Sequence, residues 1–341
     1  MTQPTILLLA FLALLSSTVW AQQDQDSEVP TEESLEIPRR HVDPEVRLAL
    51  DWLRRHQRPD GLWSTSEEAL CGDAMCAFGT SQRSALELSA LATLAILSDH
   101  SRREVPYRRM VRRASLGLLR QLETDPAPFE RGDRAGHFFA LLALLEFAEL
   151  ENPTELRERL EPLLAAIDRQ RVETTLTAEE LYAWISFRHL REMFRPQERR
   201  PWDLDEVLAA ERLFAAAPDD PDLLALVALT RIFAGESPRS SPRLEALADE
   251  IGDERCPRLE QDPPPTLGAA LLRGEVAFQL GGPAFGAWQR ARQLPLRESQ
   301  TLEGCGRGAW MLGLGSDEEF LHPLESTVFA LLILKVRFCT C

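Results

Sequence analysis

Apolar residues recur at helical spacing along most of the chain from Pro44 onward, in segments separated by Pro, Gly and Asp. None of these segments shows the sustained period-two alternation that is typical of strands. We therefore expect an all-α protein. The pattern predicts six pairs of helices, over residues 45–57 and 81–98, 107–122 and 134–150, 154–168 and 177–194, 204–216 and 221–234, 243–251 and 266–280, and 284–298 and 322–336.

Two kinds of helix alternate in this pattern. The first helix of a pair is often amphipathic and rich in Arg and Glu, as in residues 44–57, PEVRLALDWLRRHQ. The second is nearly apolar on every side, as in residues 85–97, ALELSALATLAIL, and 326–336, STVFALLILKV. Because a helix that is apolar all round must be buried all round, we expect two concentric layers, with the apolar helices inside.

The charge balance excludes one large class of partners. The chain has 341 residues, with 54 acidic and 38 basic side chains and a formal net charge of -16. Binding to nucleic acid requires clustered Lys and Arg, because these neutralise phosphates, whereas the arginines here are dispersed along the sequence. We expect no nucleic-acid partner.

The N-terminal segment is typical of an exported protein. The apolar run ILLLAFLALL over residues 6–15 is followed by small residues and Ala21, which predicts a signal peptide at 1–21. The run is too short to span a bilayer, so we expect no transmembrane anchor after cleavage. Residues 22–43 are acidic and have few large apolar side chains, which predicts a disordered tether. The expected product is a secreted or periplasmic protein with a folded domain at 44–338 and a tail at 339–341.

One stretch of the sequence carries a specific resemblance. Residues 49–63, ALDWLRRHQRPDGLW, combine the pair Trp52-Leu53 with Gln57 and Gly61-Leu-Trp63. They resemble the QW repeat of squalene and oxidosqualene cyclases. A second Gly-x-Trp, Gly308-Ala-Trp310, precedes the last apolar helix.

The resemblance extends over about residues 45–337. Together with residues 136–147 and 278–288, the chain is similar to uncharacterised exported bacterial proteins that are built from prenyltransferase/squalene-cyclase-type repeats. The resemblance implies an α/α toroid, in which six outer and six inner helices close on themselves. This agrees with the pairing of helices and the two layers expected from hydrophobicity.

The catalytic motifs of these families are absent from the sequence. The closest strings to the cyclase Asp-x-Asp-Asp are residues 203–206 and 219–222, and both precede predicted helices, where acids act as caps. Glu303-Gly304-Cys305 matches only part of the prenyltransferase zinc site, and we expect His322 to be a solvated loop residue. The thioester motif Gly-Cys-Gly-Glu-Gln is broken after Gly306. We therefore expect no catalytic residue of these kinds, no metal site and no cofactor.

An even number of cysteines in an exported chain predicts disulfides rather than zinc. Cys305 lies in a loop, and our preferred partner for it is Cys256, which also precedes an inner helix. Cys71 and Cys76 form the second candidate pair. The sequence leaves the pairing, and the role of Cys339 and Cys341, open.

Two functions fit these observations. Our main hypothesis is an exported, non-catalytic toroid that acts as a binding or scaffold protein for a protein, peptide or glycan. Its predicted contact surface is a rim of loops with Trp63, Trp310, Asp60 and Arg307.

The alternative is an enzyme that acts on a lipid, an isoprenoid or a glycan through an unrecognised site. Cleavage of a glycosidic bond requires two carboxyl groups about 5–10 Å apart. Acids in loops are more often simply solvated charges. The candidate acids are Asp60, Asp73, Asp133, Glu303, Asp317, Glu318 and Glu319.

Overall fold

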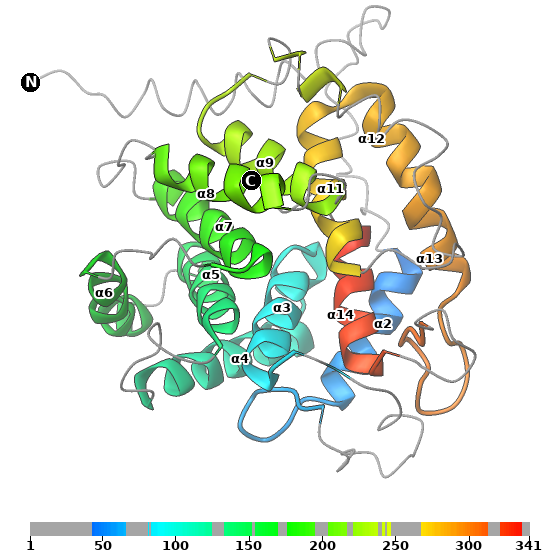
Figure 1. Ribbon diagram of the computed structural model, residues 1–341. Coiled ribbons are helices and arrows are strands. Elements are labelled where there is room, and N and C mark those ends of the chain that lie inside the picture. The colour runs from blue at the N-terminus through cyan, green and yellow to red at the C-terminus, as the bar shows by residue number, and fades with distance from the viewer. Residues whose placement is uncertain are drawn as a thin grey trace, which may run out of the picture. The chain divides into compact units, whose positions relative to one another are not determined.

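Apolar helices form a closed inner ring in the computed structural model (Figure 1). Around this ring α3 packs on α5, α5 on α7, α7 on α9, α9 on α11, α11 on α14, and α14 on α3 again. The members of the ring are α3 (Ala85–Leu97), α5 (Arg134–Glu151), α7 (Ala178–Phe194), α9 (Pro221–Phe233), α11 (Leu267–Leu280) and α14 (Pro323–Leu334). The predicted all-α toroid is confirmed.

The structure describes most of the chain after residue 42. Within that part, no helix is long and apolar enough to cross a membrane. The predicted signal peptide and all but the last residue of the predicted tether lie outside it, so both stay predictions. The described residues are 43–65, 81, 83–124, 133–151, 154–169, 176–194, 204–216, 221–237, 241–242, 244–246, 267–312 and 321–335.

A second set of helices covers the inner ring from outside. α4 packs on α3 and α5, α8 on α9, α12 on α11, and α2 on α14. The predicted outer helix at 243–251 lies mostly outside the described residues, although 244–246 are helical. The outer elements are α2 (Pro44–Arg55), α4 (Val105–Thr124), α6 (Thr154–Arg169), α8 (Leu204–Ala216) and α12 (Gly282–Trp288), with a 3₁₀ turn η2 (His100–Arg103) between α3 and α4.

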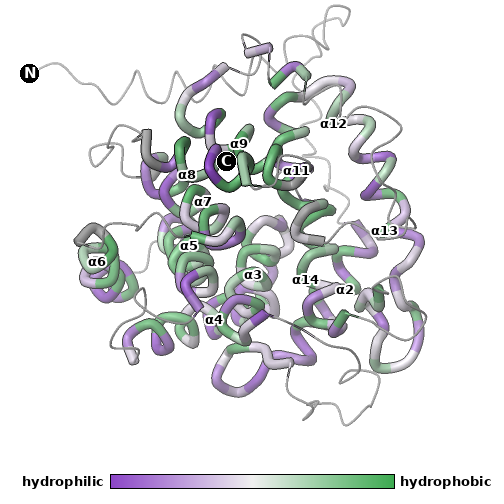
Figure 2. Tube along the Cα trace, viewed as in Figure 1, coloured by the Kyte–Doolittle hydropathy of each residue, from purple (hydrophilic) through white to green (hydrophobic). Residues whose placement is uncertain are grey.

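Burial follows the two hydrophobic patterns in the sequence. All residues of α14 are buried, as expected for a helix without a polar face. In α4, by contrast, a stripe that includes Tyr107, Met110 and Leu118 is buried while the arginines of the other face are exposed. Figure 2 shows the hydrophobic residues concentrated along the inner helices. Hydrophobic burial therefore determines which helices lie in the inner layer and which in the outer layer.

The last outer segment departs from prediction. The sequence predicts one helix over 284–298, but α12 passes through a π-helical turn η4 (Gln289–Gln293) into α13 (Leu294–Glu298). Pro295 explains the change, because proline lacks the N–H for an i→i−4 bond and its ring clashes with the preceding turn. Buried Gln293 of this turn donates from Nε2 to the carbonyl of Ile333 in α14, 2.9 Å away, and so ties the turn to the inner ring.

The toroid closes where the last outer segment contacts the first helix. Nε2 of Gln300 donates to the carbonyl of Glu45 in α2 over 2.8 Å. Arg297 forms ion pairs with Asp43 and, at 3.5 Å, with Glu45. Arg55 donates to the carbonyl of Arg307 over 2.8 Å. Polar contacts therefore join residues from opposite ends of the described chain.

Candidate functional site

Arg83 gathers three glutamates at the N-terminal end of the inner ring. Its Nη1 donates to Glu87 of α3 and to Glu179 of α7, and its Nε donates to Oε1 of Glu325 in α14 over 3.1 Å. The guanidinium carbon lies 4.7 Å from the centre of the Phe329 ring, a cation–π contact. We name Arg83, Glu87, Glu179 and Glu325 the Arg83 cluster. Three inner helices thus direct carboxyl groups to one cation.

Helix capping explains why these acids meet. Each lies in the first turn of its helix, where the free N–H groups and the helix dipole favour negative charge. Ser84 caps α3 by accepting from the Glu87 N–H at 2.9 Å, and its hydroxyl donates to Asp133. Asp133 in turn caps α5. The first turns of the inner helices are therefore fixed against one another.

A second ion pair supports the same end. Arg134 of α5 donates from two nitrogens to Glu180 of α7, over 2.9 and 3.2 Å. Glu180 also accepts from the N–H of Thr177 at 2.9 Å, and Thr177 caps α7 in return. This is a capping box. It ties Glu180 into the framework while its neighbour Glu179, 41% exposed, remains accessible at the surface.

The charges in the Arg83 cluster favour a proton on Glu87. Burial raises the pKa of the Glu87 carboxyl; Arg83 opposes this, while nearby Asp133 and Glu325 add to it. One guanidinium cannot balance three carboxylates, so one acid retaining its proton lowers their repulsion. Glu87 is only 5% exposed and is the natural proton donor of the group.

His322 lies beside this cluster, at the start of α14. Its Nδ1 accepts from the N–H of Leu324 at 3.2 Å, which places the proton of the neutral ring on Nε2. Burial lowers the pKa of His322 and keeps the ring neutral. The expectation of a solvated loop histidine is wrong, because the side chain is buried as a helix cap.

Three buried polar atoms at the start of α14 have no hydrogen-bond partner among the described residues: Nε2 of His322, Oε2 of Glu325 and Oγ of Ser326. A buried polar group without a partner costs about 1–3 kcal/mol. Such groups mark places where a ligand can supply the missing bond. Two possible donors, Nε2 of His322 and Oγ of Ser326, and one acceptor, Oε2 of Glu325, therefore lie beside Arg83.

The Gly-x-Trp loops are parts of the framework. The Trp63 indole is 1% exposed and donates from Nε1 to the carbonyl of Leu53 over 2.9 Å. The Trp310 indole is fully buried and donates to the carbonyl of Leu296 over 2.6 Å. The structure thus places both indoles in the core rather than on the predicted rim, and each fixes the end of an outer helix.

The glycines of these loops allow a close backbone approach. Gly61 has φ +94°, and a Cβ there would lie 2.2 Å from the carbonyl oxygen of Arg113. Gly308 has φ +99°, and its Cβ would lie 2.1 Å from the carbonyl oxygen of Leu48. Only glycine adopts such a conformation without strain. In both repeats the loop therefore lies directly on the neighbouring outer helix.

A glutamine completes each repeat. Nε2 of Gln57 donates to the carbonyls of Gly61 and Met110, over 2.8 and 2.9 Å. Gln300 donates in the same way to Gly308, over 3.0 Å, and to Glu45. The sequence pattern did not indicate Gln300 because it lies eight positions before its glycine, whereas Gln57 lies four positions before Gly61. The two loops are equivalent in geometry.

Asp60 and Arg307 are the exposed members of the predicted rim. Asp60 accepts from the Leu62 N–H at 3.0 Å and pairs with Arg58 at 3.1 Å. The carbonyl of Arg307 accepts the bond from Arg55. A role of Asp60 and Arg307 in binding stays a prediction.

Cys305 lies against a histidine. Its Sγ is 3.6 Å from Nε2 of His56, whose Nδ1 is 2.8 Å from the carbonyl of Trp52 and must donate to it. Nε2 therefore faces the sulfur as an acceptor. Cys71, Cys76 and Cys256 lie outside the described residues, so both predicted disulfides stay predictions. No group of His, Cys, Asp and Glu that could hold a metal ion occurs in the described part.

A small cavity lies deeper in the ring. It measures about 80 Å³ and is lined by side chains from all six inner helices. Glu275 of α11 accepts from the Tyr182 hydroxyl at 2.8 Å, and Glu146 of α5 lines the same cavity. Burial raises the pKa of each acid to about 7. The cavity has room for several water molecules beside the two acids.

Of the described loop acids that the sequence offered as candidates, only one lies at the Arg83 cluster. Asp133 lies against the Arg83 cluster, whereas Asp60 and Glu303 are exposed. The four remaining candidates, Asp73, Asp317, Glu318 and Glu319, lie outside the described residues. The signal that was missed is an acid in the first turn of an otherwise apolar helix, as at Glu87 and Glu325.

Comparison with known proteins identifies a similar fold. No protein-family model matches the chain, and no similar sequence was found among curated proteins. The structure is similar to the GH76A α-1,6-mannanase of Salegentibacter sp. HEL1_6, with a TM-score of 0.58 and 8% identity over 86% of this chain and 98% of that chain. An inactive variant, in which two adjacent aspartates are replaced by asparagine, gives the same values in complex with α-1,6-mannotriose.

These similarities correct our main functional hypothesis. The expectation of a non-catalytic binding or scaffold protein is wrong, because the solved structures that share the fold are glycan-cleaving enzymes. The missing cyclase, zinc and thioester motifs did not exclude catalysis, since glycosidases need only carboxyl groups. Of what the resemblance to cyclase repeats implied, the toroid fold is confirmed. The squalene-cyclase type is not.

Proposed function

We propose that this protein cleaves glycosidic bonds in a glycan and that the Arg83 cluster is its carboxyl centre. The observation that carries the proposal is the convergence of Glu87, Glu179 and Glu325 on one guanidinium. Two carboxyl groups held by one guanidinium lie within the limit of about 10 Å that glycosidases use. The fold shared with an α-1,6-mannanase supports this chemistry, and an α-mannan is the first substrate to test.

The environments of the acids suggest separate roles. Glu87, whose pKa is raised by burial, donates its proton to the leaving oxygen as the bond to the anomeric carbon breaks. Glu179 is the most exposed acid of the cluster and serves as the second carboxyl group of the reaction. Glu87 and Glu179 contact the same nitrogen of Arg83, and this closeness favours a double displacement, for which carboxyl groups lie about 5–5.5 Å apart.

In this scheme a carboxylate oxygen of Glu179 attacks the anomeric carbon while Glu87 protonates the leaving oxygen. Water then attacks the same carbon, its proton passes to Glu87, and Glu179 is released. The anomeric configuration is retained. Arg83 holds Glu179 in position through the ion pair between them.

The test uses the full chain and a panel of glycans headed by α-1,6-manno-oligosaccharides. Turnover is measured as released reducing ends, and the first product anomer is identified by NMR. Glu87→Gln and Glu179→Gln should each lower turnover by about 10²–10⁴-fold. Glu298→Gln is the matched control, because Glu298 is an exposed acid of α13 outside the cluster.

Melting temperatures of all variants separate lost chemistry from lost folding. If both cluster variants fold and retain full turnover, the Arg83 cluster is not the active centre. If the wild type cleaves no glycan of the panel, the proposed activity is wrong. An inverted first product would refute Glu179 as the nucleophile.

A further inference from the structure

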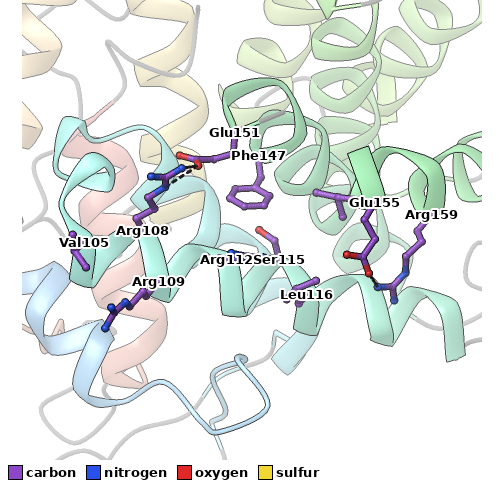
Figure 3. Close-up of a pocket in the computed structure, with 11 residues that line it drawn as sticks. Val105, Arg108, Arg109, Arg112, Ser115, Leu116, Phe147, Glu151, Glu155 and Arg159 are labelled. Carbon is purple, nitrogen blue, oxygen red and sulfur yellow. Dashed lines mark hydrogen bonds and ion pairs between the residues drawn. The ribbon is translucent and has the colours of Figure 1, made fainter. Parts of the chain in front are cut away.

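A pocket on the outside of the toroid lies between α4, α5 and α6. It encloses about 480 Å³, within the range of small-molecule sites. It adjoins Glu151 at the C-terminal end of α5, whereas the Arg83 cluster lies where the inner helices begin. Figure 3 shows its lining residues, which come from all three helices. We name it the α4–α6 pocket.

Arginines dominate the polar lining of this pocket. Arg108 donates to Glu151 over 2.8 and 2.5 Å, and Arg159 donates to Glu123 over 2.8 and 2.6 Å. Both are therefore compensated. Arg109 and Arg112 also line the pocket, and neither forms an ion pair with any residue that the structure describes. The pocket therefore has two arginines whose charge no described acid balances.

The two uncompensated arginines can act together. They are three positions apart on α4, a spacing that places side chains on the same face of a helix. A guanidinium presents a planar fork of N–H donors that matches the oxygens of an anion. Two such forks on one face form a site for an anion with several oxygens.

The floor of the pocket supplies an independent sign of a ligand. Ser115 is completely buried, and its hydroxyl has no hydrogen-bond partner within the described part of the chain. In Figure 3 it lies between α4 and the ring of Phe147. A buried hydroxyl without a partner is unfavourable in the free protein. A ligand oxygen above it would supply that bond.

The rim of the pocket is apolar. Val105 and Leu116 line it and are 61% and 37% exposed. Phe147 and Leu156 provide buried apolar surface behind them. The pocket thus combines cations with surface suited to the uncharged part of a small molecule.

We propose that the α4–α6 pocket binds a phosphate monoester carried by a small soluble molecule. A phosphate monoester bears a charge of about -1.5 to -2 near neutral pH, which matches two uncompensated arginines. A carboxylate bears only one negative charge and would leave one arginine unmatched. Arg112 binds the phosphate oxygens, Arg109 one turn away on α4 adds a second positive charge, Ser115 donates its hydroxyl to a phosphate oxygen, and Leu116 and Phe147 cover the organic part.

The test is isothermal titration of the full chain with a hexose 6-phosphate and with inorganic phosphate, at constant ionic strength. The hexose 6-phosphate should bind more tightly than inorganic phosphate because it also covers apolar surface. The double variant Arg109→Gln/Arg112→Gln should weaken binding at least about 10-fold. Arg290→Gln, at an exposed arginine of the π turn, is the matched control and should leave affinity unchanged.

Ser115→Ala provides a readout that a purely structural role would not give. It should weaken phosphate binding about 5- to 10-fold without lowering the melting temperature, because an unpaired buried hydroxyl is removed. Equal affinity in all variants, or no saturable binding, would overturn the proposal. Binding only to phosphatidic acid vesicles, lost in the double variant, would overturn the soluble ligand. None of these outcomes depends on the Arg83 cluster.

Discussion

Glu275 should make the protein less stable as the pH rises from about 5 to 8. The carboxyl is buried in the ring, and burial raises its pKa from 4.5 to about 7 although the Tyr182 hydroxyl opposes the shift. Between these two values the native state holds a proton that the unfolded state has lost. The contribution of Glu275 to stability is therefore complete below about pH 4.5 and is lost as the pH rises through 7.

The shift gives the size of the effect. One pKa unit corresponds to about 1.4 kcal/mol, so the change at Glu275 is about 3 kcal/mol between pH 4.5 and pH 8. Glu146, which lines the same cavity, has its pKa raised to the same value by burial and contributes in the same direction. Domains are stable by about 5–15 kcal/mol, so the decline is large enough to measure.

The assay is urea unfolding of the wild type and Glu275→Gln at a series of pH values. Glutamine retains an oxygen that can accept from Tyr182 and cannot ionise. The variant should equal the wild type near pH 5 and exceed its unfolding free energy by about 3 kcal/mol near pH 8. Glu298→Gln, at an exposed position, should follow the wild type throughout.

If the unfolding free energies of wild type and Glu275→Gln changed in parallel with pH, the reasoning would be refuted. Glu275 would then have the same pKa in the native and the unfolded state. A variant that is less stable at high pH would refute it as well. Glu146→Gln should reproduce the effect, and a double variant should show whether the two acids of the cavity interact.

Three further predictions concern the framework. Gly308→Ala should lower the melting temperature strongly because its Cβ would meet the carbonyl of Leu48, whereas Gly235→Ala, with φ +97° but open space around it, should lower it less. Trp310→Phe removes the donor to the carbonyl of Leu296 and should cost about 1–3 kcal/mol in urea unfolding. Mass mapping under non-reducing conditions should find Cys305 linked to Cys256, and alkylation of both as thiols would contradict that pairing.

The layers of the fold could be predicted because burial leaves a direct trace in the sequence. The inner helix α14 is apolar on every side and α4 on one side only, so their positions follow from pattern alone. The break before Pro295 was also visible in the sequence. It was overlooked because the apolar pattern continues across the proline.

The candidate site was harder to predict because its members are far apart in sequence. Glu87, Glu179 and Glu325 each satisfy a local rule, that acids favour the first turn of a helix. Only closure of the ring brings them to Arg83. Likewise, the pattern of the Gly-x-Trp loops indicates Trp63 and Trp310 but not whether the indoles face solvent, and their hydrogen bonds to helix ends decide that they are buried.

The contacts that join Gln300 to Glu45 and Arg297 to Asp43 have a consequence for biosynthesis. The flank of α3 that meets α14 stays uncovered until the last helix has been made, because α14 closes the ring. Such pairing has a high contact order and folds slowly. During synthesis the early hairpins must therefore persist as partly folded intermediates with apolar surface. A nascent chain that stops before α14 should be a substrate for chaperones and proteases rather than a smaller stable domain.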